Sequence, residues 1–327
     1  MATKVAKKHC RRKEGIDRIS ELPDPLIYHI LSFLPTFYAV RMSIVSKRWR
    51  HMWIYTSVLH FEDFKSLTLL KLKGFRLEDS FPVNLESLKV LCLERVNIYG
   101  RTSLQNLISG CPIIEDLCLR DIYFQLSKDI VAGATLRNLT LWNLRLTDEM
   151  VDDLGWRHPL LEKLTMRSCS NLNHISIQRD SLKSLFLAHD CPIEIKIMTP
   201  NLVSFVFEGL VMSNISVFDA PNLVEATLKL LDTRLDNRTW FPLILFLSYF
   251  KFLKKMTLCF CFQENVIIPK DVRNICCRSL PTLKHLKVKM DNDTLWTNSE
   301  IRDSFVWCAP SLETFEMEYL SYTYFNL

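Results

Sequence analysis

The sequence is poor in glycine and lacks the short motifs of the common enzyme classes. Its 7 glycines are scattered among 327 residues, and no low-complexity tract interrupts the chain. It contains no glycine-rich phosphate loop, no Gly-x-Ser-x-Gly elbow and no His-Glu-x-x-His helix. Nothing in the sequence therefore points to nucleotide-dependent, hydrolytic or metalloprotease chemistry, and we expect a protein that is not an enzyme.

Long apolar runs are also missing. The longest apolar stretch, Trp240–Phe250, is interrupted by Pro242 and Ser248 and falls short of the about 20 residues that a membrane helix needs. The N-terminus has no apolar core of a secretory signal. We therefore expect a cytoplasmic or nuclear protein without a membrane partner. The 11 cysteines follow no disulfide framework, which fits reduced thiols in those compartments.

The net charge of +5 is concentrated at one end of the chain. Residues 1–18 hold seven basic and two acidic residues, whereas the rest holds 34 of each. A nucleic-acid-binding domain usually carries its excess charge on the folded surface, so we expect no nucleic-acid partner. Residues 1–15 are predicted to be a basic, disordered tail. Within it, Lys7–Lys13 is either a nuclear localisation signal or a solvated leader.

Residues 16–58 have the pattern of three short helices. Asp24 is predicted to cap the first helix, with Pro25 at its first position. Further helical patterns cover Tyr38–Ser46 and Lys47–Ile54. A unit of this size cannot bury all of its apolar surface, so part of that surface should meet another protein.

Motifs in the same segment carry a family resemblance. They are Leu22-Pro23, Ile30-Leu31, Leu34-Pro35, Val45-Ser46-Lys47-Arg48-Trp49-Arg50 and Trp53. The segment resembles an F-box of the plant type, which implies docking to a Skp-type adaptor and, through it, to a cullin. The positions assigned by this resemblance to adaptor contact, or to the framework beneath it, are Leu22, Pro23, Ile27, Ile30, Leu31, Leu34, Pro35, Val45 and Trp49.

The segment departs from the family pattern at one place. Phe37-Tyr38 replaces a charged pair common in the family. These aromatic residues either strengthen the adaptor contact or leave apolar surface exposed. The alternative for the whole segment is an ordinary helical cap on the repeats that follow.

Residues 59–327 repeat the frame apolar-x-x-apolar-x-apolar. The frames begin at Leu67, Leu88, Ile114, Leu136, Leu161, Leu182, Leu202, Leu223, Leu253, Leu283 and Leu312. Their spacing, 20 to 30 residues, is typical of leucine-rich repeats. Each frame predicts a short strand whose alternate side chains enter a core shared with its neighbours. We predict an α/β fold, in which a three-helix F-box precedes a solenoid of about 11 repeats. Its parallel sheet lines the concave side, and its return limbs are irregular or helical.

The F-box and the repeats together resemble the large plant F-box/leucine-rich-repeat family. Leu161–Leu172, with Cys169, is similar to the cysteine-containing repeat subtype, and Leu146–Leu154 is predicted to form a capped helix. The resemblance implies a non-catalytic substrate-recognition subunit of an SCF-type ubiquitin ligase, whose repeats hold a target protein for ubiquitination. The alternative is a non-ligase interaction scaffold with a degenerate F-box.

The strand positions that alternate with the apolar ones are candidates for target binding. They include Arg120, Trp142, Arg167, Phe186 and Glu208. Exposed aromatic residues and arginine are typical of binding hot spots; alternatively, loops cover them. Four later lysines form a basic stripe at Lys229, Lys255, Lys287 and Lys289. This stripe either holds an anionic cofactor, as the family's hormone receptors would imply, or is a mixed, solvated face.

Two cysteine pairs were considered as metal ligands. Cys259 and Cys261 belong to an apolar strand, and Cys276-Cys277 are adjacent in sequence. Neither pair has the spacing of a structural zinc knuckle. We therefore expect buried, reduced cysteines, with neither metal nor cofactor.

Overall fold

The computed structural model describes residues 21–34, 42, 49, 66–74, 76–78, 83–99, 103–122, 134–191, 193–210, 214–231, 237–260, 266–276, 278–291 and 297–320. Its contacts divide the chain into two compact units, Met1–Asp63 and Phe64–Leu327. The sequence had placed this boundary a few residues earlier, after residue 58. The first unit contains the segment that resembles an F-box, and the second contains all the repeats.

Helix α1 (Asp24–Ser32) is the helix described in the first unit. It begins one residue earlier than expected, with Pro23 at the N-cap, and no side chain caps it. The prediction that Asp24 is the cap is therefore wrong. The physical reason is that the Pro23 carbonyl accepts the backbone N–H groups of Leu26 at 3.0 Å and Ile27 at 3.2 Å, which already closes the first turn around Asp24.

Three apolar side chains form the core of this unit. Ile27 and Leu31 on α1 pack with Trp49, and all three are at most 2% exposed. Leu22, Tyr28, Leu34 and Met42 pack against this cluster and are partly buried. The helices predicted over residues 38–46 and 47–54 lie outside the described residues, apart from Met42 and Trp49.

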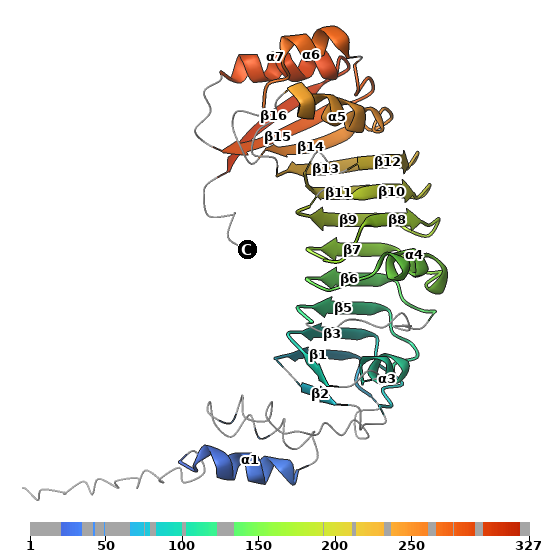
Figure 1. The fold of residues 1–327 in the computed structure, drawn as a ribbon, viewed down its shortest axis with the longest axis vertical. Helices are drawn as coiled ribbons and strands as arrows, with labels where there is room; N and C mark the ends of the chain where they lie inside the picture. Colours follow the sequence, from blue (N-terminus) through green and yellow to red (C-terminus); the bar gives the residue numbers. More distant parts are fainter. Residues whose placement is uncertain are drawn as a thin grey trace, which may run out of the picture. The chain divides into compact units, whose positions relative to one another are not determined.

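The second unit is built on an 11-stranded parallel sheet (Figure 1). Its strands, in spatial order, are β1 (Leu69–Lys73), β3 (Val90–Glu94), β5 (Asp116–Arg120), β6 (Asn138–Trp142), β7 (Lys163–Arg167), β9 (Ser184–His189), β11 (Ser204–Gly209), β13 (Glu225–Leu230), β14 (Lys255–Phe260), β15 (His285–Asp291) and β16 (Thr314–Leu320). Each of the eleven predicted frames places its last two apolar residues on one of these strands. The predicted solenoid fold is thus confirmed.

The pairing register aligns equivalent residues of successive turns. Leu139 on β6, for example, lies between Leu117 on β5 and Leu164 on β7. All three are buried, and the same alternation of buried and half-buried residues recurs along the strands. Since a single turn cannot bury its own apolar side chains, the core exists only as a stack shared between neighbours.

A sharp turn follows each of the first five strands. The residue after the strand has a positive φ in every case: Gly74 (65°), Arg95 (52°), Asp121 (51°), Asn143 (51°) and Ser168 (49°). Their backbone N–H groups continue the hydrogen-bond ladder by donating to a carbonyl oxygen at the end of the next strand, at 2.9 to 3.0 Å. The acceptor is the last residue of that strand in four cases, and for Ser168 it is Ala188, one residue before the end of β9. Aspartate and asparagine tolerate this left-handed conformation better than most residues.

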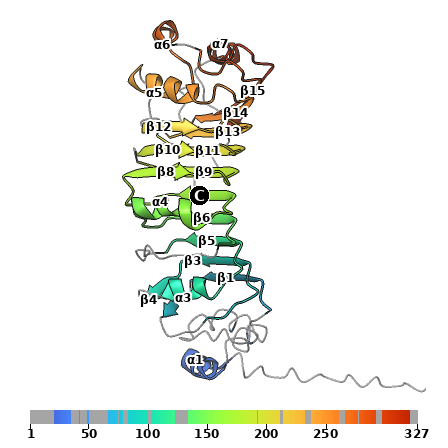
Figure 2. The same cartoon turned by 90° about the vertical axis from the view of Figure 1, so that its right-hand side faces the viewer.

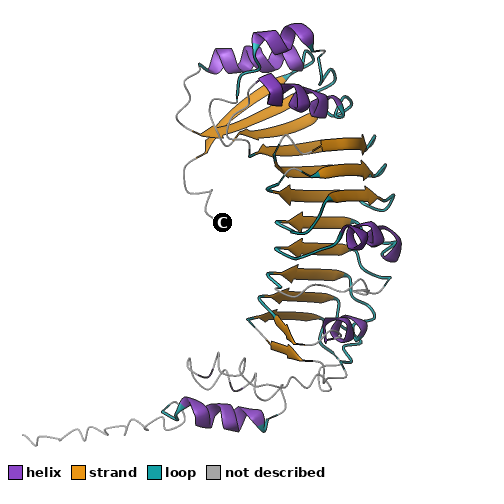
Figure 3. Cartoon of the chain, in the orientation of Figure 1, coloured by secondary structure: helices purple, strands orange, loops and turns teal. Residues whose placement is uncertain are grey.

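The return limbs contain either strands or helices (Figure 3). Strands β8 (His174–Gln178), β10 (Glu194–Met198) and β12 (Asn214–Asp219) form a second parallel sheet, and β2 (Arg76–Glu78) pairs with β4 (Asn97–Tyr99). Figures 1 and 2 both show β8, β10 and β12 beside β9, β11 and β13. The described helices of this unit are α3 (Ser103–Ser109), α4 (Asp148–Arg157), α5 (Asn237–Ser248), α6 (Lys270–Ile275) and α7 (Asn298–Cys308).

Repeat length decides which kind of limb is formed. The three intervals of 20 or 21 residues between Leu161 and Leu223 contain the strands of the second sheet. Intervals of 25 to 30 residues contain α3, α4, α5, α6 or α7. A strand advances about 3.3 Å per residue and a helix only 1.5 Å, so a short limb can span its turn only in extended form. The return limbs were expected to be irregular or helical; these three instead form strands that pair with one another.

Helix α4 confirms the helix expected over Leu146–Leu154, although Thr147 at its N-cap makes no side-chain cap hydrogen bond. Asp148, in the first turn, instead accepts the backbone N–H groups of Asn173 at 2.8 Å and His174 at 3.3 Å. The helix is therefore tied to the start of β8.

Replacement of Phe205 by alanine should strongly destabilise the second unit. Phe205 is 1% exposed, and its ring centroid lies 5.1 Å from that of Phe218 and 6.1 Å from that of Phe250. We expect the free energy of unfolding in urea to fall by about 3–5 kcal/mol. Val203→Ala, two residues away and 42% exposed, is the control and should change it by less than about 0.5 kcal/mol. Equal effects of the two substitutions would contradict the assigned core.

Cysteine alkylation should follow burial. Burial raises the pKa of Cys111 to about 12 and that of Cys169 to about 11, whereas Cys191 is exposed. A pKa of about 11 instead of 9.0 cuts the reactive thiolate population about a hundredfold at pH 8. With iodoacetamide and mass spectrometry at pH 8, we expect Cys191 to be alkylated before Cys111 and Cys169. Cys111 and Cys169 should become reactive on unfolding in urea, and rapid labelling of the native thiols would argue against this core.

Candidate functional site

The side of the large sheet that faces away from the core is a candidate binding surface, which we call the open face. It is formed by the half-buried side chains that alternate with the buried apolar ones, such as Thr140 and Trp142 on β6. Because successive turns are in register, equivalent open-face residues form columns across the strands. The last column runs along the strand ends, directly before the left-handed turn residues.

Three predicted target-binding residues meet in this column. The register places Trp142 between Arg120 and Arg167. The guanidinium carbons of both arginines lie 4.9 Å from the centre of the Trp142 ring, which is cation–π distance. We call these three residues the Trp142 cluster. All three are half-buried, and the Nε of Arg120 is buried without a hydrogen-bond partner.

The other two predicted residues lie on the next strands. Phe186, on β9, is half-buried between Thr165 and Val206 in the neighbouring column. Glu208, on β11, accepts a hydrogen bond at 2.7 Å from Lys229. The structure therefore places all five residues on the open face, with three in direct contact and Glu208 engaged by a neighbour.

Carboxylates accompany each lysine of the basic stripe. Lys287 and Lys289 lie 2.7 and 3.1 Å from Glu318, and Lys255 lies 3.9 Å from Glu225. Hydrogen bonds from Lys287 and Lys289 lower the pKa of Glu318 and keep it charged. This arrangement matches the mixed, solvated face that was one of the two interpretations of the stripe.

Two thiols lie side by side on the open face near the Trp142 cluster. Cys92 and Cys118 are register partners on β3 and β5. Burial, followed by a hydrogen bond to Cys92, raises the pKa of Cys118 to about 11, although Arg120 acts in the opposite direction. A thiol with so high a pKa is a poor nucleophile, so Cys118 lacks the activation typical of catalytic cysteines.

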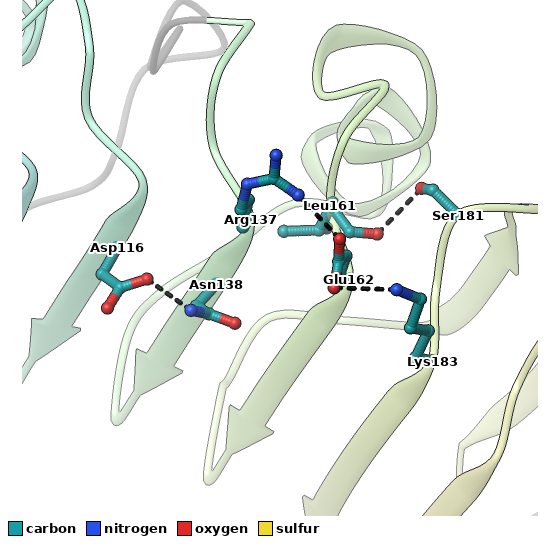
Figure 4. Close-up of polar contacts among 7 residues, drawn as sticks. All are labelled: Asp116, Arg137, Asn138, Leu161, Glu162, Ser181 and Lys183. Carbon is teal, nitrogen blue, oxygen red and sulfur yellow. Dashed lines mark hydrogen bonds and ion pairs between the residues drawn. The ribbon is translucent and has the colours of Figure 1, made fainter.

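An ion-pair ladder that was not anticipated runs beside the open face. It joins consecutive turns through Lys89–Glu115 (2.8 Å), Arg137–Glu162 (2.7 Å) and Lys183–Glu162 (3.1 Å). Figure 4 shows its Arg137–Glu162–Lys183 portion, beside the hydrogen bond that Asn138 donates to Asp116. Each charged residue is the second residue of its frame, so the alternating sign at this fixed position was the sequence signal for the ladder.

Attraction within this ladder keeps its acids ionised. The hydrogen bond from Lys183, aided by the positive charges of Lys183 and Arg137, lowers the pKa of Glu162. A hydrogen bond from Lys89 likewise lowers the pKa of Glu115. Exposed pairs of this kind contribute little stability each, but they require the observed register between turns.

The first unit presents an apolar stripe along α1 and its C-cap residue, Phe33. Leu26, Ile30 and Phe33 recur at helical spacing and are 49%, 38% and 74% exposed. The Phe33 ring packs edge-on against His29, with 4.8 Å between the ring centroids. Large apolar side chains gathered on one exposed helix face are typical of a protein-docking surface.

The structure separates surface from framework among the predicted adaptor-binding residues. Ile27, Leu31 and Trp49 are buried in the unit's own core, and Leu22 and Leu34 are partly buried against it. Pro23 and Ile30 are exposed. Pro35 and Val45 lie outside the described residues. Sequence reasoning missed Leu26 and Phe33, which the helical period links to Ile30.

Within the described ranges, no three histidine, cysteine, aspartate or glutamate side chains gather as they would around a metal ion. In the same ranges, no helix has both the length and the apolar character of a membrane span.

Family models match both units. The F-box domain model matches residues 19–60. The model of the LRR repeats of FBD-associated F-box protein At5g56370 matches residues 41–179, and that of the At1g61320/AtMIF1 LRR domain matches residues 112–324. F-box domains generally bind Skp-type adaptors, and the exposed stripe of α1 lies within the matched F-box residues.

Three similar proteins from Arabidopsis thaliana are named as F-box proteins, two of them as F-box/LRR-repeat proteins. Putative F-box/LRR-repeat protein At3g18150 is 30% identical over 57% of this chain and 45% of its own length. F-box protein At5g03100 is 28% identical over 69% of this chain and 80% of its own length. Putative F-box/LRR-repeat protein At5g02930 is 29% identical over 50% of this chain and 40% of its own length.

This chain thus spans less than half of the first and third of these relatives. The third family model nevertheless matches well over half of the chain, and the F-box model matches the segment ahead of it. The chain therefore belongs to the plant F-box/leucine-rich-repeat family.

Proposed function

We propose that this protein is the substrate-recognition subunit of an SCF-type (Skp–cullin–F-box) ubiquitin ligase. The F-box docks the Skp-type adaptor, which links the protein to a cullin, and the open face of the repeats holds a target protein for ubiquitination. The observation that carries the proposal is the F-box at residues 19–60, with apolar side chains exposed on its first helix.

The chemistry of α1 supports the adaptor contact. One side of the helix packs into the unit's own core through Ile27 and Leu31. The side chains of Leu26, Ile30 and Phe33 remain exposed. Burying such side chains against a partner yields about 1.5–3 kcal/mol each. Three of them on two helical turns therefore suit a stable protein contact.

The role of the protein in this proposal is proximity rather than chemistry. A receptor that binds both the target and the ligase scaffold raises the effective concentration of target lysines near a ubiquitin-loaded conjugating enzyme. Ubiquitin transfer becomes faster because the bound target is held near the conjugating enzyme. The subunit therefore needs no catalytic residue of its own. We place this activity in the cytoplasm or the nucleus, with support from the basic run Lys7–Lys13.

Phe33→Ala should weaken adaptor binding without unfolding the chain. Phe33 is 74% exposed, so its truncation leaves the core intact but removes apolar contact area from the complex. We expect adaptor affinity to fall about tenfold to a hundredfold, because about 1.4 kcal/mol corresponds to a factor of ten. Isothermal titration calorimetry of the purified chain with a Skp-type adaptor measures this change in affinity.

The matched control is Ile275→Ala on α6, where the side chain is 71% exposed but belongs to the repeats. Its adaptor affinity should equal that of the wild type. Equal affinity of the Phe33→Ala variant would contradict adaptor docking through α1. Recovery of adaptor without cullin from cell extracts would instead favour the non-ligase scaffold.

A further inference from the structure

The ion-pair ladder is interrupted at two neighbouring turns. The second residue of each frame is charged from the turn of β3 to that of β9, and again from the turn of β14 to that of β16. In the turns of β11 and β13 this residue is Val203 and Val224, and the backbone N–H of Val224 donates to the Val203 carbonyl oxygen at 3.0 Å. They are 42% and 55% exposed. Two adjacent apolar side chains therefore replace charges on this surface.

Phe252 extends the apolar surface to the next turn. It directly precedes the frame of β14 and is 63% exposed. In the turns of β9, β11, β13 and β15 the corresponding residue is polar and donates a hydrogen bond to a carbonyl oxygen of the preceding turn; these residues are Ser181, Asn201, Asn222 and Thr282. Phenylalanine cannot make this bond, and its ring is left at the surface. We call Val203, Val224 and Phe252 the ladder gap.

A cavity of about 400 Å³ adjoins the ladder gap. It lies between the end of β12, the start of the β13 frame and the C-terminal end of α5, and its apolar lining includes Leu223, Phe252 and Leu253. Asp219 and Lys251 also line it, with opposite charges. The Lys251 ammonium lies 5.1 Å from the centre of the Phe252 ring. The cavity has room for an apolar side chain of a bound segment.

The charged residues on both sides of the ladder gap are lysines. Lys183 and Lys254 occupy the second frame position in the turns of β9 and β14. Earlier in the ladder, Glu162 lies between two cations, at 2.7 and 3.1 Å. Lys254 is exposed, and no carboxylate of the described residues forms an ion pair with it. Glu225, which follows Val224, lies 3.9 Å from Lys255. The chain therefore supplies no acid between the two lysines at this position of the frame.

We propose that the ladder gap and its cavity dock an amphipathic, acidic segment of the target protein. An apolar side chain of the segment enters the cavity against Phe252, and another packs on Val203 and Val224. An aspartate or glutamate beside them pairs with Lys254, and Lys183 adds positive charge on the other side. Exposed apolar side chains gathered in one place are typical of protein-docking surfaces. The inference rests on the proposed function for the identity of the segment's owner.

The first experiment selects peptides from a displayed library of random, unmodified dodecapeptides on the purified full chain, which requires neither adaptor nor cullin. We expect enrichment of large apolar residues with an aspartate or glutamate close by. The affinity of a fluorescein-labelled selected peptide, measured by fluorescence anisotropy, should fall as salt is added. Selection without acidic residues, or an affinity that does not respond to salt, would overturn the proposal.

Val203→Glu is the decisive variant, because it returns an acid to the ladder beside Lys183. Val203 is exposed, so the fold should be kept, which the melting temperature checks. The peptide should bind at least about tenfold more weakly, since apolar contact is lost and the new carboxylate repels the acid of the peptide. Thr68→Glu is the matched control. It adds the same charge at the same frame position in the turn of β1, where Thr68 is exposed, and the affinity should not change.

Lys254→Gln separates charge from apolar contact. It should weaken peptide binding and reduce the response to salt, because it removes the positive charge but none of the ladder gap. If Val203→Glu lowers the melting temperature, Phe252→Ser takes its place and should also weaken binding. Wild-type affinity in the Val203 or Lys254 variant, or an equal loss in Thr68→Glu, would contradict docking at the ladder gap. Adaptor titration is measured separately, so failure here is distinguishable from failure of the ligase assignment.

Discussion

The parallel register between successive turns is the constraint on which the rest of the second unit depends. A turn gains a buried core only by placing its apolar pair directly over that of its neighbour, as Leu139 does between Leu117 and Leu164. That alignment also fixes every residue in between. Neighbouring turns therefore create columns of equivalent residues, with neighbouring members of one column on strands about 4.8 Å apart. Both the ion-pair ladder and the Trp142 cluster are consequences of this spacing.

The sequence predicted the eleven strands because their apolar alternation is strict, and the strand ends then identified Arg120, Trp142 and Arg167 as open-face residues. It did not show that these three side chains stack, since contact depends on rotamers and on which frames are spatial neighbours. The pairing of β8, β10 and β12 was missed because strands were predicted only at the repeat frames, although His174–Gln178 between two frames has a similar alternation of its buried residues. On α1, Ile27 and Ile30 have the same character in sequence, and only packing distinguishes core from surface.

Paired charges and the exposed apolar stripe of α1 lie on different parts of this chain. The strand-end column neutralises most of its own charge through neighbouring lysine–glutamate pairs such as Lys229–Glu208. Such pairs contribute to strand register and solubility more than to the binding of a partner. In the Trp142 cluster of the same column, an aromatic ring lies between two arginines, and both guanidinium groups contact it at cation–π distance. On α1, by contrast, the stripe proposed to meet a partner consists of the apolar side chains Leu26, Ile30 and Phe33.

The dependence of limb type on repeat length has a consequence for how such proteins diversify. Inserting several residues between two frames converts an extended limb into a helical one, yet the strands on either side keep their hydrogen bonds and their columns. Insertions and deletions are thus absorbed on the side of the solenoid that carries the limbs, while the ligand-reading side changes through point substitutions alone. Selection can consequently tune what is recognised and how long the chain is as two nearly independent traits.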